Sequence, residues 1–144
     1  MDREAFIRYV EARSSETAFA PLGIRVVSYD PDALQVGLDI DARHRQHLGL
    51  LHGGISALLA ESAASLAAAM SVDPEHFTVA GVDLNATHLR RKVEGSLLAT
   101  ARPLFRGRTT HVYAIDITDE DGELVCTSRC TLAIRPRKAP AGGR

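Results

Sequence analysis

The sequence predicts a two-layer α+β domain, in which a curled antiparallel sheet wraps around one long central helix. Residues from Gly53 to about Met70 are rich in Ala, Leu and Ser, which predicts a helix that is buried on most sides and ends before Pro74. Every segment after Pro74 reads as a strand, and the last, residues 123–134, alternates between two faces as antiparallel strands with one protected face do. Such a sheet and one apolar helix bury each other in two layers.

The other elements follow in order along the chain. Phe6, Tyr9 and Val10 have helical spacing, which predicts a short amphipathic helix over residues 2–13. The segment 20–23, which contains proline and glycine, is expected to break regular structure. Strands are expected at residues 24–29, 34–40, 77–90, 96–105, 109–118 and 123–134, with a turn at 30–33 and an irregular loop at 41–51.

Length, charge and the N-terminal segment favour one cytoplasmic domain. We expect a single domain over residues 1–135, followed by a basic Pro/Gly-rich tail, residues 136–144, that is disordered. The formal net charge of −1 gives no overall field that would favour nucleic acid or an anionic membrane. The N-terminus lacks the apolar stretch of a signal peptide, and the longest apolar run, residues 63–70, is too short to span a bilayer.

The two cysteines are expected to be core residues. Cys126 and Cys130 are an even number of positions apart in a predicted strand, so their side chains share one face. This arrangement fits disulfide geometry poorly, and no second pair of ligands completes a metal site. We expect a reduced protein with no metal and no organic cofactor.

Glu61 is the one carboxylate in the middle of the apolar helix. Most glutamates in helices lie on a solvated surface, but Leu58, Leu59 and Leu66 leave little solvated face here. An ionised carboxylate in apolar surroundings is unfavourable unless it is paired, hydrated or in use. Ser65 lies one turn later on the same face and can donate a hydrogen bond to Glu61 or to a bound nucleophile. We interpret Glu61 as a catalytic group.

The sequence His52-Gly53-Gly54 lies where the polar loop becomes the helix. The free backbone N–H groups and the dipole make a helix N-terminus electropositive, and glycine lets a substrate carbonyl approach the backbone closely. Gln46 can supply a second donor from the loop. Together these groups have the composition of an oxyanion hole. The alternative is that the glycines serve only close packing of the helix on the sheet.

A group of cations forms the third candidate site. Its members are His88, Arg90, Arg91, Arg106 and Arg108. The period of two places His88 and Arg90 on the face of Val82 and Leu84. We expect adjacent strands, joined by a turn at Gly95, to bring the two halves of the group together. Arginine side chains suit phosphate oxygens, so the group is a candidate site for a polyphosphate ligand. The alternative is a solvated strand end with scattered cations.

Three motifs resemble the hotdog-fold thioesterases of the PaaI-like group. They are H-L-G-L-L-H-G-G-I-S-A-L-L-A-E-S from His47, G-V-D-L-N-A-T-H-L-R-R from Gly81, and P-L-F-R-G-R-T-T from Pro103. The chain is particularly similar to the branch with 4-hydroxybenzoyl-CoA thioesterases of the Arthrobacter type and 1,4-dihydroxy-2-naphthoyl-CoA hydrolases, over about residues 20–135. The most specific part of this resemblance is the combination of Gln46, six residues before His52, with Glu61, nine residues after His52.

The resemblance implies a hotdog fold and a catalytic set. Glu61 is implied to be the catalytic carboxylate, and the Gly53 backbone amide is implied to form the oxyanion hole. The Gln46 side chain is implied to lie near the thioester carbonyl. His52 corresponds to the active-site histidine, and the Ser65 hydroxyl to the group that helps to place water.

The resemblance also implies which residues contact coenzyme A and how chains assemble. The CoA-contacting positions are Gly81, His88, Leu89, Arg90, Arg91, Phe105, Arg106, Gly107, Arg108, Thr109 and Thr110. Thr87 replaces a frequent Asn, and Arg91 and Arg106 add positive charge, so this chain departs from the family in its nucleotide contacts. Hotdog domains pair through their sheets and form active sites between two chains, which implies a homodimer and often a homotetramer.

We therefore expect an enzyme that hydrolyses an acyl- or aroyl-CoA thioester to the free acid and CoA. Glu61 would act as general base or as nucleophile, and the sequence leaves both open. A hotdog hydratase or dehydratase and a non-catalytic acyl-CoA-binding module are the alternatives. The acyl group is also open, because Leu48, Leu50, Leu51 and Phe105 suit an aromatic or an aliphatic pocket equally.

Overall fold

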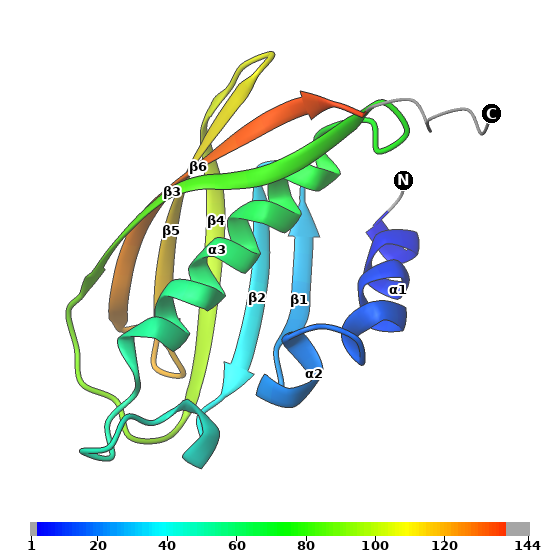
Figure 1. The fold of residues 1–144 in the computed structure, drawn as a ribbon. Helices are drawn as coiled ribbons and strands as arrows, with labels where there is room; N and C mark the ends of the chain where they lie inside the picture. Colours follow the sequence, from blue (N-terminus) through cyan, green and yellow to red (C-terminus); the bar gives the residue numbers. More distant parts are fainter. Residues whose placement is uncertain (1–2, 138–144) are drawn as a thin grey trace.

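A six-stranded antiparallel sheet curls around one long helix, α3 (Gly53–Met70), in the computed structural model (Figure 1). The structure describes residues 3–137. The order across the sheet is β1-β2-β4-β5-β6-β3. The strands are β1 (Arg25–Asp30), β2 (Ala33–Asp39), β3 (Phe77–His88), β4 (Ser96–Arg106), β5 (Thr110–Asp119) and β6 (Leu124–Pro136). The predicted α+β fold, a curled sheet around one central helix, is confirmed.

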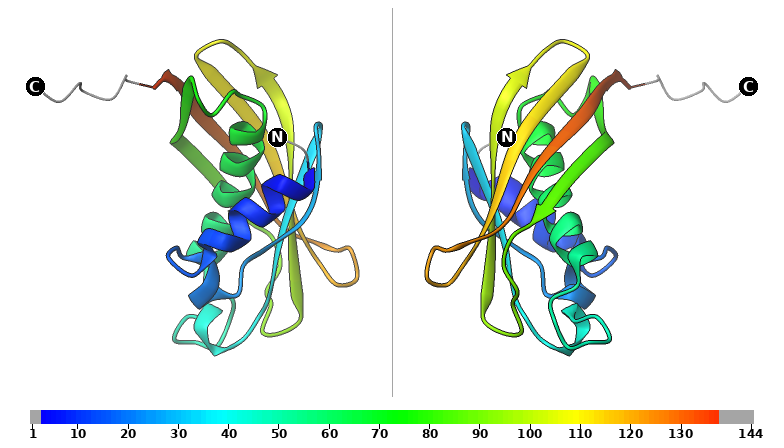
Figure 2. Two further views of the ribbon diagram at one scale, coloured as in Figure 1. Left: turned by 90° about the vertical axis from the view of Figure 1, so that its right-hand side faces the viewer. Right: turned by 90° about the vertical axis from the view of Figure 1, so that its left-hand side faces the viewer.

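The helix α3 packs on the concave side of the sheet through one face only (Figure 2). Its fully buried side chains are Leu59, Ala60, Ala63, Ala64 and Ala68. Their small size lets the helix axis approach the strands closely. By length and composition α3 could cross a membrane, but in this fold its apolar face belongs to the core. The prediction that α3 is buried on most sides is wrong for the single chain, because the sheet covers only one side.

Two short helices precede the sheet and one short turn follows β2. The predicted N-terminal helix is confirmed as α1 (Arg3–Ser14). The expected break at residues 20–23 is wrong in part, because a short helix, α2 (Phe19–Leu22), forms there. Pro21 is tolerated in a first helical turn, where its missing N–H has no intrahelical partner. Gly23, with φ of 62°, then ends the helix in the left-handed conformation.

The predicted strands are confirmed, but their pairing differs from the expectation. β3 pairs with β6, whereas β4 pairs with β2 and β5. Residues 89–95 therefore form a long connection across the end of the sheet and not a tight turn at Gly95. β6 extends to Pro136, which pairs with Phe77. Residues 138–144, most of the predicted tail, lie outside the described residues.

A β-bulge changes the faces of β3. The register with β6 shifts between Gly81 and Asp83, so Val82 is the extra residue and is exposed. Leu84 and Ala86 face α3, but Val82 does not share their face as predicted. Asp83, Asn85 and Thr87 lie on the opposite, exposed face.

The prediction for the cysteines is confirmed. Cys126 and Cys130 are both free thiols and both buried. They lie on the core face of β6, where Cys126 is opposite Ile117 and Cys130 is opposite Tyr113 of β5.

Candidate active site

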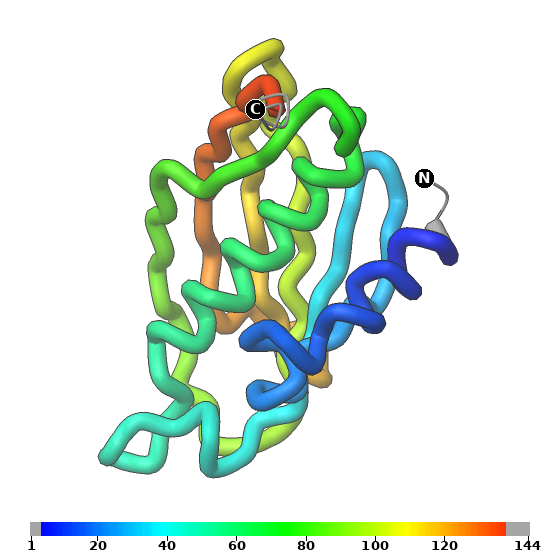
Figure 3. Tube along the Cα trace, turned by 45° about the vertical axis from the view of Figure 1, so that its right-hand side comes forward, coloured from blue at the N-terminus to red at the C-terminus, as the bar shows by residue number. Residues whose placement is uncertain are grey.

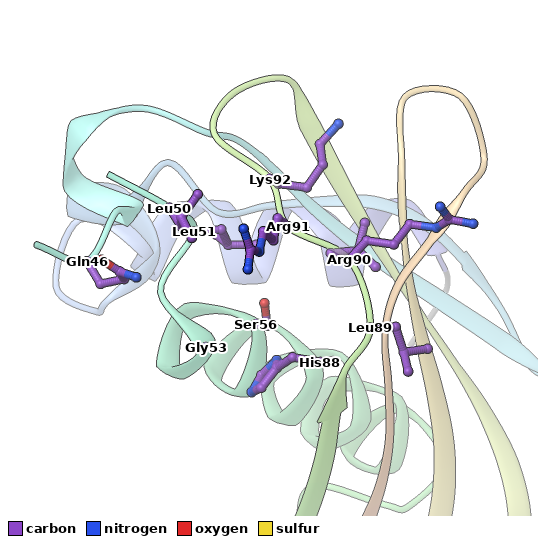
Figure 4. A pocket seen from close by; sticks show the side chains of 11 residues that line it. Gln46, Leu50, Leu51, Gly53, Ser56, His88, Leu89, Arg90, Arg91 and Lys92 are labelled. Atoms are coloured by element: carbon purple, nitrogen blue, oxygen red, sulfur yellow. The ribbon is translucent and has the colours of Figure 1, made fainter. Parts of the chain in front are cut away.

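A pocket of about 400 Å³ opens at the N-terminus of α3 (Figure 4). It is formed by the loop before α3, the first turn of α3, and the connection after β3. Of the predicted site residues, it brings together Gln46, Gly53, His88, Leu89, Arg90 and Arg91. Leu50 and Leu51, expected at the acyl group, also line it. Within one chain, this pocket therefore unites the predicted carbonyl-binding residues with the first half of the cation group.

His52 caps the N-terminus of α3. Its backbone is extended, and its Nδ1 accepts a hydrogen bond of 2.8 Å from the Gly54 N–H. Gly53 is the first helical residue, so its N–H is among the four that have no carbonyl partner within the helix. Because Gly53 also lines the pocket, this N–H is placed to bind a carbonyl oxygen or an oxyanion.

His88 lies directly against Gly53. A Cβ atom at position 53 would be 2.7 Å from the His88 Nε2, so the imidazole would have to move away from any other residue here. Glycine at this position therefore allows the last residue of β3 to reach the start of the helix. The imidazole of His88 stands beside the place where Gly53 would bind a carbonyl oxygen.

Gln46 is held in a compact turn of the loop. Its backbone N–H donates to the Leu50 carbonyl at 2.8 Å, and its carbonyl accepts from the Gly49 N–H at 2.8 Å. Its side-chain Oε1 accepts from the Leu48 N–H. This contact leaves the Gln46 amide nitrogen as the donor available to a ligand.

Hydrogen bonds from several elements fix the loop before α3. The buried His44 contacts the Leu22 carbonyl through Nε2 at 2.8 Å, which ties the loop to the end of α2. The Arg45 Nε donates to the Val93 carbonyl at 2.7 Å, and the Leu51 N–H donates to the Lys92 carbonyl at 2.8 Å. The two segments that form the pocket are thus joined to each other.

The cations at the pocket differ in their partners. Arg90 points toward the β5–β6 turn, where it pairs with Glu123 at 2.5 Å, whereas Arg91 extends to lie between Leu51 and Ser56 (Figure 4). Lys92 pairs with Asp119 and Glu120. Burial alone would lower the pKa of Lys92, but the hydrogen bonds to these carboxylates outweigh burial and raise it. Lys92 is therefore charged but balanced by two carboxylates, and Arg90 is balanced by Glu123, which leaves Arg91 as the main positive charge that faces the pocket.

Glu61 lies outside this pocket, on the uncovered side of α3. Its side chain is exposed in the single chain and lines a separate groove with Ser65, Leu66 and Leu84. The expectation that Glu61 has little solvated face is wrong here, because, of the sheet, only the edge strand β3 reaches this side of the helix and the rest of the groove is open. Ser65 is on the same face as Glu61, as predicted from the helical period.

Gly81 lies against the Glu61 carboxylate. A Cβ atom at position 81 would collide with the Glu61 Oε1. The predicted CoA-contacting glycine therefore lies beside the carboxylate, at the bulge of β3, and away from the cations at His88. Because Gly81 has no side chain, the carboxylate has room beside the β3 backbone.

The second half of the cation group lies at the far end of the sheet. The hairpin between β4 and β5 carries Phe105, Arg106, Gly107, Arg108, Thr109 and Thr110, and Figure 3 shows it at the end opposite to the loop before α3. Arg106 donates to the Pro31 carbonyl and is 3.6 Å from Asp32. The prediction that adjacent strands bring both halves together is wrong within one chain, since β5 and β6 separate β4 from β3.

Sequence reasoning missed three residues of the pocket, Ser56, Lys92 and Val125. Ser56 lies three positions after Gly53 on the same helix face, so the helical period carried the signal. Lys92 was adjacent to the predicted cations. Val125 reaches the pocket only through the pairing of β6 with β3, for which the sequence carries no local signal.

Comparisons with known proteins identify the family of this chain. Residues 48–126 match the thioesterase superfamily. A 1,4-dihydroxy-2-naphthoyl-CoA hydrolase from Listeria monocytogenes is 42% identical over 117 residues, which are 81% of this chain and 94% of the relative. A crystal structure of a mutant thioesterase from Pseudomonas aeruginosa, with glutamine changed to alanine, is 37% identical with a TM-score of 0.88 and covers 91% of this chain and 94% of that chain.

Two mutant structures of one Staphylococcus aureus thioesterase also match, each at 30% identity. The variant with glutamate changed to alanine has a TM-score of 0.82 and covers 84% of this chain and 100% of its own. The variant with glutamine changed to alanine has a TM-score of 0.80 and covers 82% and 98%. In the Staphylococcus aureus protein, the glutamine changed in one variant and the glutamate changed in the other are fifteen positions apart. Gln46 and Glu61 have the same separation in this chain.

The chain therefore belongs to the thioesterase superfamily and has its hotdog fold. It is an enzyme that hydrolyses thioester bonds. The relatives are named hydrolases and thioesterases, which favours this class over a hydratase or a non-catalytic binding module.

Proposed function

We propose that the enzyme hydrolyses acyl-CoA thioesters at a site shared by two copies of the chain. The observation that carries this proposal is the pocket at the start of α3, where the Gly53 N–H, the Gln46 amide and the cations surround one cavity. A thioester carbonyl at Gly53 would leave Arg91, which lines the same pocket, to face the CoA part of the substrate. The free, buried thiols fit the reducing cytoplasm, which we propose as its location.

The distance between Gly53 and Glu61 favours an active site that is formed by two copies of the chain. They are eight residues apart on one helix, roughly 12 Å along its axis, so one carbonyl cannot contact both within a chain. Ala57 is midway between them and lines the uncovered groove. If two α3 helices cross antiparallel near Ala57, Gly53 of one chain faces Glu61 of the partner subunit.

The exposed edge of β3 supports the same pairing. β3 is the last strand of the sheet, and its free edge can pair with a second copy. Antiparallel pairing about a two-fold axis brings the β4–β5 hairpin of one chain toward His88 of the other. The two halves of the cation group would then meet across the interface. We propose a homodimer, with association of two dimers into a tetramer as its extension.

The chemistry assigns separate tasks to the two chains. The Gly53 N–H and the Gln46 amide polarise the thioester carbonyl and stabilise the oxyanion. Glu61 of the partner subunit either takes a proton from water as the oxygen attacks the carbonyl carbon, or attacks that carbon itself. In the first route the C–S bond breaks and the CoA sulfur takes the proton that Glu61 removed from water. In the second route the CoA thiolate leaves a mixed anhydride, water hydrolyses that anhydride to the free acid and the Glu61 carboxylate, and a proton of this water passes to the thiolate. The fifteen-residue separation shared with the mutated pair in the Staphylococcus aureus thioesterase supports Gln46 and Glu61 as these partners.

Release of free thiol from a panel of CoA thioesters tests the proposal. We expect Glu61→Ala to lower kcat by about 10²–10⁴-fold, the usual contribution of a general base, with an unchanged melting temperature. Glu94→Ala, an exposed glutamate in the 89–95 connection, is the matched control and should leave kcat unchanged. Near-normal turnover by the Glu61→Ala enzyme would exclude the assignment. No metal or organic cofactor enters this scheme, so dialysis against a chelator should leave kcat unchanged.

A single turnover in ¹⁸O-labelled water separates the two roles of Glu61. If Glu61 is the general base, the label enters only the product acid. If Glu61 is the nucleophile, hydrolysis of the anhydride transfers label into its carboxylate, which mass spectrometry of the peptide detects.

A further inference from the structure

A second cavity continues from the Glu61 groove along α3. Its volume is about 520 Å³, and it lies between α1, the C-terminal half of α3 and the start of β3. Ser65 and Leu66 line both the groove that holds Glu61 and this cavity. The cavity is therefore an extension of the proposed catalytic site, and an inference about it rests on the proposed function.

Most residues that line the cavity are apolar. Its walls include Phe6, Leu66, Ala69, Met70, Phe77 and Val79. Phe6 is a buried core residue and packs near the Tyr29 ring at 6.1 Å between ring centroids. The pocket at the start of α3 differs, because three consecutive cationic residues, Arg90 to Lys92, line that pocket. The two cavities suit the two ends of an acyl-CoA, one for the charged CoA and one for an apolar acyl group.

The length of the path indicates the kind of acyl group. Glu61 and Met70 are nine residues apart on α3, roughly 13 Å along the axis. An extended chain of about ten carbons spans this distance with single C–C bonds of about 1.5 Å. The volume also lies within the range of small-molecule sites, about 300–1,000 Å³.

We propose that this cavity binds the acyl chain of the substrate and that the preferred substrates are medium-chain, unbranched acyl-CoA thioesters. The chain enters at the Glu61 groove, passes Leu66 and ends between Met70 and Phe77. The helix α1 forms the outer wall through Phe6 and Tyr9, so it limits the length of chain that the site accepts. The sequence left an aromatic and an aliphatic acyl group open, and this proposal takes the aliphatic one, in a cavity whose lining the sequence did not identify.

Two substitutions change the cavity in opposite directions. Ala69→Leu fills the cavity near its far end, whereas Met70→Ala enlarges it. Ala12→Leu, at an exposed position of α1, adds the same side chain outside the cavity and serves as the control. The measurement is kcat/KM for acetyl-, butyryl-, octanoyl-, decanoyl-, dodecanoyl-, palmitoyl- and benzoyl-CoA.

For the unmodified enzyme we expect kcat/KM to be highest at octanoyl- to dodecanoyl-CoA. Ala69→Leu should lower kcat/KM for decanoyl-CoA by about tenfold or more, because excluding even one methylene group from an apolar pocket can have an effect of this size. It should change kcat/KM for acetyl-CoA by no more than about twofold. Met70→Ala should move the maximum to a longer chain. Melting temperatures of the three variants control for misfolding.

The outcomes distinguish this inference from the proposed function. Chain-length profiles that are the same for all variants, or a maximum at benzoyl-CoA that Ala69→Leu leaves intact, would overturn the acyl-chain assignment while leaving the thioesterase site standing. A failure to release thiol from every ester would instead overturn the proposed function. If Ala69→Leu does not fold, the shift caused by Met70→Ala still decides the question.

Discussion

Glu61 and Gly81 show how single residues place the candidate catalytic group. The carboxylate lies on the uncovered side of α3, and the β3 backbone approaches it where Gly81 has no Cβ atom. The sequence predicted Glu61 as the reactive group from its apolar neighbours. It did not predict the contact with Gly81, because that contact depends on how β3 crosses the helix.

Gly81→Ala should lower kcat without preventing folding. The added methyl group would collide with the Glu61 Oε1 and displace the carboxylate. A displacement of about 1 Å at a reacting group can cost about 10²-fold in rate, so we expect a loss of this order. Ala80→Val, which enlarges the neighbouring exposed side chain, is the control. A Gly81→Ala enzyme with normal kcat would show that catalysis does not require the Glu61 carboxylate to lie beside residue 81.

The cysteines should not react with thiol reagents in the native protein. Burial, together with the charges of Glu61 and Asp83, raises the pKa of Cys130 to about 11, and burial also raises the pKa of Cys126. At pH 8 both remain protonated, and the thiolate is the reactive form. Iodoacetamide should label both thiols in denaturant and neither without it. Rapid labelling of the native protein would contradict this account of the core face of β6.

At the scale of elements, the position of the candidate site is set by the N-terminus of α3 and the loop before it. The sequence located this helix within a residue or two, because its composition and the following proline are local signals. The sequence did not show that only one helix face is covered, since coverage depends on the curvature of the sheet. It also missed α2, whose end is tied to the loop before α3 through His44.

His52 is expected to act by positioning the helix. Its Nδ1 accepts the hydrogen bond of an N-cap, and asparagine is a better N-cap residue than alanine. His52→Ala should lower the free energy of unfolding by about 1 kcal/mol and reduce kcat, whereas His52→Asn should recover most of both. Chemical denaturation and thiol release measure the two effects. Recovery of stability without recovery of kcat would mean that the imidazole contacts the substrate directly.

At the scale of the whole molecule, strand order separates groups that are close in sequence. β3 and β4 are consecutive in the chain, yet β5 and β6 lie between them in the sheet. The two halves of the cation group therefore lie at opposite ends of one chain. The two cavities that we propose for the CoA part and the acyl part of the substrate also lie at opposite ends of α3. Strand periodicity predicts that strands exist, but pairing order depends on long-range contacts that a single sequence does not display.

In the proposed site, the carbonyl-binding residues come from one chain and the carboxylate comes from the other. Mixing Gln46→Ala and Glu61→Ala chains tests this arrangement. In a mixed dimer, one site contains both substitutions and the other contains neither. Random exchange makes half of the dimers mixed, each with one intact site, so the expected activity is about one quarter of wild type.

We expect Gln46→Ala to lose activity as Glu61→Ala does, because the thioester carbonyl loses a donor. The two variants should be denatured together, refolded and assayed for thiol release, beside each variant refolded alone. The account predicts that activity returns only in the mixture and rises toward the one-quarter limit as exchange is completed. If both functions reside in a single chain, every chain in the mixture lacks one of them. A mixture that remains as inactive as its components, although exchange is complete by mass spectrometry, would contradict the shared site.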